Sequence, residues 1–264
     1  MRSTEDLEFL VLGPLEVRRG QRRVPVRGWR ERAVLTMLLL ADGNTVTVER
    51  LVAAAWDGDP PFGAVKAVRN CVSALRHRLA GDDGTVIPIE ANPAGYRLPA
   101  DTGRLDARDF RRQVDATRQL AAAGDAERAA AGLRDALSWW RGPALDGAGS
   151  QIVQHCAARL DEERMTALEE YLDLELVLGR HRQVTSELLA LARQHPLRER
   201  FTGQLMLALY RSGRQAEALD AYLRLAKRLA EDLGIDPTPA VSQLHDAILR
   251  HDPSLDGHLT ALMP

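Results

Sequence analysis

The apolar residues between Pro60 and Gly81 follow the spacing of an amphipathic helix. Five of them recur at intervals of 3, 4, 3 and 4 residues, at Val65, Val68, Val72, Leu75 and Leu79. Because an α-helix turns once in about 3.6 residues, these side chains share one face, which we expect to be buried. The same segment contains four Lys or Arg residues and no acid. The pattern therefore predicts a helix with one packed face and one cationic face.

Short apolar runs separated by turn residues open the chain and predict a small antiparallel sheet. Two runs lie within residues 7–17, and a third covers residues 24–26. Helical periodicity follows at residues 29–41 and 48–56. The residue before the second of these helices, Thr47, is of a type that caps helix N-termini.

Two strand-like segments follow the cationic helix, at residues 85–90 and 95–98, and a turn at residues 91–94 joins them in a predicted hairpin. A sheet, three helices and a hairpin, in this order, are typical of a winged helix-turn-helix domain with an added N-terminal sheet. In helix-turn-helix domains one recognition helix lies in the DNA major groove. We therefore expect the cationic helix to contact DNA.

Helical phasing sorts the polar residues of the cationic helix into two groups. Those opposite the apolar face carry amine, amide, hydroxyl or imidazole groups, and they are Lys66, Asn70, Ser73 and His77. Groups of this kind can form hydrogen bonds with base edges. Arg69 and Arg76 flank the apolar face, where their guanidinium groups are expected to neutralise phosphates.

From residue 105 onward the pattern is helical throughout. The predicted helices cover residues 106–123, 125–140, 151–178, 181–194, 197–212, 214–232 and 238–250. Gly179 and Gly213, each followed by Arg, are 34 residues apart, which is the tetratricopeptide period. With a linker-like composition at residues 99–104, the sequence predicts an α+β winged helix-turn-helix domain followed by an all-α tetratricopeptide-like repeat domain. The predicted boundaries are residues 1–100 and 101–264.

Motifs in both predicted domains resemble known protein families. The V-x-x-L-R run ending at Arg76 and the Gly-Tyr-Arg-Leu segment at residues 95–98 resemble the OmpR-type DNA-binding domain. Residues 138–147, SWWRGPALDG, and residues 207–249 resemble the bacterial transcriptional activation domain. In this order, and over roughly residues 7–252, the chain resembles the Streptomyces antibiotic regulatory protein (SARP) family.

The SARP resemblance implies an activator of secondary-metabolite, typically antibiotic, gene clusters. It implies binding to direct repeats in double-stranded promoter DNA and recruitment of RNA polymerase. Direct repeats require a second copy bound head-to-tail, because an identical orientation on DNA demands a heterologous contact. The hairpin is expected to reach the minor groove as a wing, through Asn92 and Arg97. The loop containing Asp57, Asp59 and Pro60 is expected to meet the sigma factor of the polymerase holoenzyme.

Charge and composition agree with a globular regulator. Residues 1–97 carry 14 Lys and Arg against 12 Asp and Glu, whereas the remainder is acidic. A polar start and the lack of any apolar run of about 20 residues predict a cytoplasmic protein without a membrane partner. Cys71, Cys156 and the seven His residues show no ligand spacing, and no phosphate-binding G-x-x-x-x-G-K-[ST] loop occurs. We therefore expect neither a metal nor a cofactor.

The alternatives to a DNA-binding activator are a protein-binding scaffold and an enzyme. A tetratricopeptide scaffold whose winged helix binds protein is the principal alternative. The cationic, acid-free helix argues against it, because the centre of a protein-binding face is normally depleted in charge. An enzyme is disfavoured, since the sequence shows no catalytic constellation.

Overall fold

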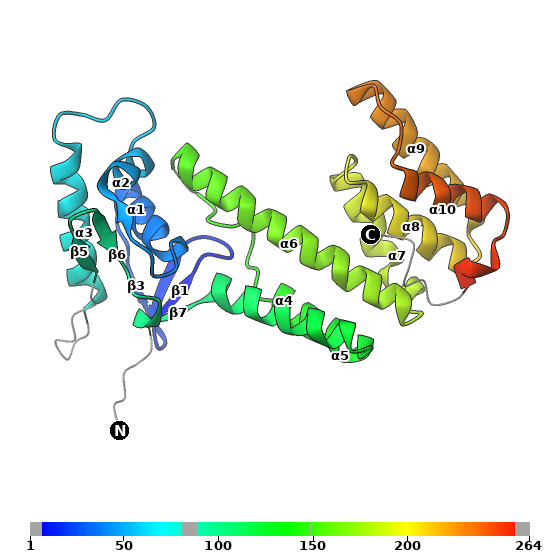
Figure 1. Ribbon diagram of the computed structural model, residues 1–264, viewed down its shortest axis with the longest axis horizontal. Coiled ribbons are helices and arrows are strands. Elements are labelled where there is room, and N and C mark those ends of the chain that lie inside the picture. The colour runs from blue at the N-terminus through cyan, green and yellow to red at the C-terminus, as the bar shows by residue number, and fades with distance from the viewer. Residues whose placement is uncertain (1–6, 81–88, 148, 257–264) are drawn as a thin grey trace. The chain divides into compact units, whose positions relative to one another are not determined.

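The computed structural model describes residues 7–80, 89–147 and 149–256 (Figure 1). Apart from its last two residues, the strand predicted at residues 85–90 lies outside this range. The chain forms two compact units. Unit 1 consists of Met1–Asp115 and Asp135–Met165, and unit 2 consists of Ala116–Arg134 and Thr166–Pro264.

Unit 1 begins with a four-stranded sheet in the order β3-β2-β1-β7. Its strands are β1 (Leu7–Leu10), β2 (Glu16–Arg19), β3 (Arg22–Val24) and β7 (Arg104–Leu105). Strands β1 to β3 are antiparallel, and the alternating side chains of Leu7, Phe9 and Val17 are buried. The predicted N-terminal sheet is confirmed. Its third strand ends before Pro25, because proline cannot donate a hydrogen bond to a neighbouring strand.

Strand β7 was not predicted, because it has only two residues and is defined by its partner. It runs parallel to β1. Gly103, just before it, lies so close to β1 that an added Cβ atom would be 2.5 Å from the carbonyl oxygen of Leu7. A short 3-10 helix at Ala100–Thr102 precedes this glycine. The linker-like residues 99–104 thus follow a defined path against the sheet.

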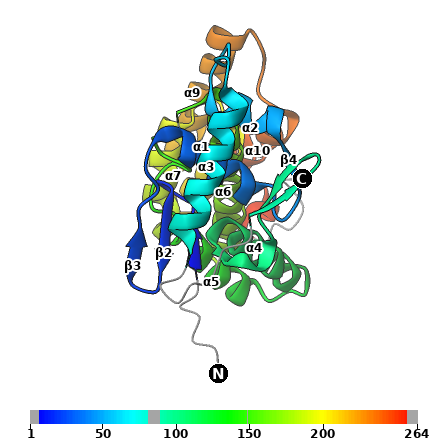
Figure 2. The same ribbon diagram turned by 90° about the vertical axis from the view of Figure 1, so that its left-hand side faces the viewer.

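Three helices and a second sheet complete the winged helix-turn-helix of unit 1 (Figure 2). The helices are α1 (Trp29–Leu40), α2 (Val48–Ala55) and α3 (Ala64–Leu79). The sheet has the order β4-β6-β5, with strands β4 (Val46–Thr47), β6 (Gly95–Arg97) and β5 (Glu90–Asn92). Thr47 Oγ1 accepts a hydrogen bond from the backbone N–H of Arg50 at 3.2 Å, which confirms the predicted N-cap of α2.

All seven helices predicted after residue 105 are present. They are α4 (Asp106–Ala122), α5 (Ala126–Leu137), α6 (Gln151–Val177), α7 (His181–Gln194), α8 (Glu199–Arg211), α9 (Gln215–Leu233) and α10 (Pro239–Leu249). The boundary between the units falls within α4, α5 and α6. In unit 2, α8 packs against both α7 and α9. The predicted order of an α+β region and a helical region is confirmed, whereas the tetratricopeptide assignment stays a prediction.

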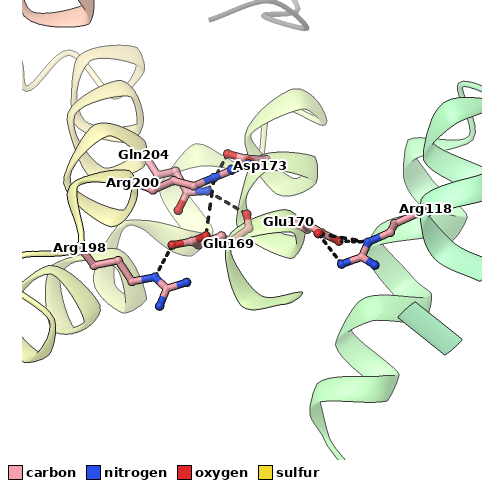
Figure 3. A network of polar contacts seen from close by, with 7 residues as sticks. All are labelled: Arg118, Glu169, Glu170, Asp173, Arg198, Arg200 and Gln204. Carbon is pink, nitrogen blue, oxygen red and sulfur yellow. Dashed lines mark hydrogen bonds and ion pairs between the residues drawn. The ribbon is translucent and has the colours of Figure 1, made fainter. Parts of the chain in front are cut away.

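A polar network inside unit 2 connects α6 to α8 (Figure 3). The fully buried Gln204 donates hydrogen bonds through Nε2 to Glu169 O at 2.8 Å and to Asp173 Oδ1 at 2.6 Å. Arg198 and Arg200, near the start of α8, form ion pairs with Glu169 and Asp173. The buried carboxylate of Glu169 therefore has a compensating charge, as buried ions require.

The carboxyl group of Asp106 joins the N-terminal sheet to the start of α4. It is 7% exposed and accepts hydrogen bonds from the backbone N–H groups of Val11, Leu12 and Ala107 at 2.8 to 3.1 Å. Burial raises the pKa of the Asp106 carboxyl, and these hydrogen bonds act in the opposite direction. Val11 and Leu12 lie just beyond the end of β1, so their backbone N–H groups are not paired within the sheet. The Asp106 carboxylate accepts these hydrogen bonds instead.

Replacing Asp106 by Ala removes the acceptor of these buried N–H groups and is expected to lower the free energy of unfolding by about 3 kcal/mol. Urea unfolding followed by circular dichroism measures this change. Asp101→Ala, at an exposed position of the preceding turn, is the control and is expected to change stability by less than about 0.5 kcal/mol. Equal unfolding midpoints for the two variants would contradict the structural role of Asp106.

Candidate nucleic-acid interface

Helix α3 is fixed in its domain by a fully buried apolar face. Val68, Val72, Leu75 and Leu79 are each 0 to 1% exposed. The predicted core position at Val65 is wrong, because this side chain is 44% exposed and Ala64 is buried in the first turn instead. Ala64 lies four residues before Val68, which is also a same-face spacing on a helix. The apolar face therefore sets the rotation of α3 about its axis.

The opposite face of α3 is exposed, polar and cationic. Its exposed residues are Lys66, Arg69, Asn70, Ser73 and His77. Within the part of the chain that the structure describes, neither Lys66 nor Arg69 has an acidic partner. The neighbouring Arg78 instead pairs with Glu31 of α1 at 3.1 Å. The face therefore offers two uncompensated positive charges beside three hydrogen-bonding side chains.

Arg76, which is predicted to contact a phosphate, also makes a contact within unit 1. Its Nε donates a hydrogen bond to the carbonyl oxygen of Ile89 at 2.9 Å, and its Nη2 bonds to the same oxygen. Ile89 is buried immediately before β5. The guanidinium group thus attaches the β5–β6 hairpin to α3.

The two wing residues predicted to reach DNA also make contacts within the hairpin. Asn92 Oδ1 accepts hydrogen bonds from the backbone N–H groups of Ala94 and Gly95, both at 2.9 Å, and shapes the turn. Arg97 pairs across the strands with Glu90, with its Nη2 2.6 Å from Glu90 Oε2. Both side chains have solvent access, but the charge of Arg97 is offset by its cross-strand partner.

Figure 2 shows α3 with the β5–β6 hairpin on one side and the β2–β3 hairpin on the other. A glycine is required where β6 meets β4. A Cβ atom added at Gly95 would lie 2.8 Å from the Cα atom of Thr47. The glycine of the Gly-Tyr-Arg-Leu segment therefore allows the close approach that holds the hairpin beside α3.

The loop between α2 and α3 combines acidic and apolar residues. Asp57 Oδ1 accepts a hydrogen bond from the backbone N–H of Gln151 at 2.8 Å, so this carboxylate caps the start of α6 while the residue stays exposed. Asp59 and Pro60, which are predicted to contact the sigma factor, are both exposed. Phe62, which was not predicted as a site residue, is fully exposed at 107%. The available signal was an aromatic residue in a Pro-rich loop, directly after Pro60 and Pro61.

No helix within residues 7–80, 89–147 and 149–256 has the length and hydropathy needed to cross a membrane. The same ranges contain no group of three or more His, Cys, Asp or Glu side chains arranged to hold a metal ion.

Two family models match the chain, one after the other along the sequence. Residues 27–98 match the family described as "Transcriptional regulatory protein, C terminal". Residues 105–249 match the family described as "Bacterial transcriptional activator domain".

Several regulatory proteins are similar over nearly the whole chain. Regulatory protein AfsR of Streptomyces coelicolor is 41% identical over 94% of this chain, which spans 25% of AfsR. Regulatory protein DnrI of Streptomyces peucetius is 33% identical over 95% of this chain and 94% of DnrI. The chain thus spans about a quarter of AfsR and almost all of DnrI.

A solved structure has the same fold. Mycobacterium tuberculosis EmbR, in complex with a low affinity phosphopeptide, superposes with a TM-score of 0.88 at 39% sequence identity. The match covers 94% of this chain and 66% of that chain. From the two domain matches and these relatives, the chain belongs to the SARP family of transcriptional regulators.

Proposed function

We propose that this regulator binds specific promoter DNA through α3 and activates transcription by recruiting RNA polymerase. The observation that carries the proposal is the exposed face of α3, which holds five polar or cationic residues and no acid. Positive side chains that neutralise phosphates supply affinity, and hydrogen-bonding side chains in the major groove supply sequence preference. The buried opposite face keeps these groups in a fixed register.

The residues of α3 have separate roles in this proposal. Lys66, Asn70 and Ser73 contact base edges, because they lie opposite the buried face. Arg69 lies beside them and contacts a phosphate. His77, further along the same face, adds a second donor to the groove or backbone. Arg76 acts indirectly, since its contact with Ile89 supports the position of the wing.

The wing and a second copy extend the proposed contact with DNA. Asn92 at the turn and Arg97 on β6 approach the minor groove. On binding, Arg97 leaves its ion pair with Glu90 and inserts into the groove, whose negative potential attracts the guanidinium group. Direct repeats place two copies head-to-tail, and their linked sites increase the overall affinity. The likeness to DnrI and AfsR supports target genes in a secondary-metabolite cluster, as does the family to which the chain belongs.

Recruitment of the polymerase holoenzyme is assigned to the loop before α3 and to the helical region. Asp59 and Pro60 are exposed in the same loop as the apolar ring of Phe62. The loop can therefore bind a basic, partly apolar patch of a sigma factor, with the Asp59 carboxylate as the charged contact and the Phe62 ring as the apolar contact. Asp57 supports this contact indirectly, because its hydrogen bond to the backbone N–H of Gln151 attaches the loop to the start of α6. We place DNA binding and the loop contact with the polymerase in residues 1–100, and the remaining polymerase contacts in residues 101–264.

The alternative, a scaffold whose winged helix binds protein, predicts a different surface on α3. A protein-binding centre is expected to be aromatic and poor in Lys. The exposed aromatic residues Phe62 and Trp29 both lie outside α3, and the face of α3 itself contains Lys66 and Arg69. This distribution favours DNA at α3 and protein at the loop.

Arg69→Ala is expected to weaken binding similarly on all DNA sequences and to reduce the salt slope by about one unit. Asn70→Ala is expected to relax the preference at one base pair and cost about 1–3 kcal/mol on the cognate site. Fluorescence anisotropy measures both on a promoter fragment found by genome-wide mapping and on single-base variants of it. Arg112→Ala, a highly exposed Arg on α4, is the control. Exchanged behaviour of the first two variants would show that the assigned roles are wrong.

The double variant Asp59→Asn with Phe62→Ala is expected to keep promoter affinity but to reduce activation about tenfold, because burying one aromatic ring stabilises a complex by about 1.5–3 kcal/mol. Transcription with purified holoenzyme measures activation. Gln21→Ala, at an exposed position of the turn between β2 and β3, is the control, because it lies outside both the loop and the helical region. Full activation by the double variant would exclude the loop as a polymerase contact.

A further inference from the structure

A cavity of about 320 Å³ lies within unit 1, between α1, β4 and α2 on one side and α4 and α6 on the other. Its volume is in the range of small-molecule sites in proteins. The deepest lining is apolar, since Met37, Val46 and Leu160 are each no more than 4% exposed. The cavity therefore offers an apolar floor large enough for a small organic body.

Three arginines line the same cavity, and a single carboxylate compensates them in part. Arg111 donates two hydrogen bonds to Glu163, at 2.7 and 3.0 Å. Arg159 lies 3.6 Å from the same carboxylate and is largely exposed. Arg50 has no acidic partner among the residues that the structure describes. One negative charge thus faces three positive charges.

Cys156 borders the cavity together with two of these arginines. This half-buried thiol lines it alongside Arg50 and Arg159. Burial raises the pKa of the Cys156 thiol, and the positive charges of Arg50 and Arg159 oppose that increase. The three side chains therefore border one space.

We propose that this cavity binds a small amphipathic organic anion. A carboxylate or sulfonate group would lie between Arg50 and Arg159, where charge-assisted hydrogen bonds are available. The apolar body would contact Met37, Val46 and Leu160. An inorganic anion fits less well, because it would leave the apolar floor without a contact. This proposal does not depend on the proposed DNA-binding function.

The cavity is directly connected to the wing. Thr45 lines it, and Thr45 Oγ1 accepts a hydrogen bond from Asn92 Nδ2 at 2.7 Å. Val46, another lining residue, pairs with Tyr96 of β6. A bound anion would touch the two residues that seat the hairpin beside α3. The proposed site and the wing thus share two contacts, through which an anion would act on the position of the hairpin.

The test uses the full chain and the fluorescent anion 8-anilinonaphthalene-1-sulfonate. Its neutral relative N-phenyl-1-naphthylamine has the same rings without the sulfonate. The anion is expected to bind one saturable site, and Arg50→Gln with Arg159→Gln is expected to weaken its binding about tenfold while leaving the neutral probe unchanged. The control, Arg224→Gln with Arg228→Gln, removes two cations from a groove in unit 2 and is expected to have no effect.

Either an unchanged anion affinity in the cavity variant or an equal loss for both probes would overturn the proposal. A loss confined to the control variant would overturn it as well, because it would place the probe in unit 2. Alkylation by iodoacetamide, followed by peptide mass spectrometry, gives an independent location. Saturating anion is expected to slow alkylation of Cys156 and not of Cys71, which lies on α3. Equal rates at Cys156 with and without the anion would exclude the cavity.

Discussion

The apolar contact between α3 and its own domain is the constraint on which the rest of unit 1 depends. Val68, Val72, Leu75 and Leu79 are removed from solvent almost completely, and each contributes roughly 1.5–3 kcal/mol of burial energy. Turning α3 by one residue would expose this face and bury polar groups. This fixed rotation directs Asn70 and its neighbours outward. The packing of the buried face therefore determines where the polar side chains lie at the candidate interface.

The wing depends on the same helix through fewer and more polar contacts. Arg76 holds the residue before β5, Asn92 bonds to Thr45, and Gly95 allows β6 to approach β4. The hydrogen bond between Asn92 and Thr45 is exposed, whereas the Arg76 contact is partly buried and Gly95 is buried. The position of the hairpin therefore depends in part on one solvent-exposed hydrogen bond, whereas α3 is held by its core.

Much of this arrangement could be predicted from the sequence, because long helices repeat their pattern. The α3 face, the Thr47 cap and the seven later helices all depend on residues close together in the chain. Strands β4 and β7 could not be predicted, since two-residue strands are defined by partners about 50 and 95 residues away.

Arg76 and Asp57 make contacts that the sequence did not predict, and the physical reason is the same for both. Helical phasing gives the direction of a Cα–Cβ bond, but the end of a long side chain follows its nearest acceptor. For Arg76 that acceptor is a carbonyl oxygen beyond the helix, and for Asp57 the partner is an N–H group 94 residues away. By contrast, Asn70 and Ser73 are short and exposed, so phasing alone predicts where their polar groups lie.

The central claim is that the exposed face of α3 lies in the major groove of promoter DNA. A photo-crosslinking amino acid at position 73, in the middle of this face, tests it directly. Irradiation of the full chain on its promoter is predicted to give a crosslink to a defined base within each repeat, mapped by primer extension. A crosslink to protein alone, with the promoter still bound, would contradict the claim.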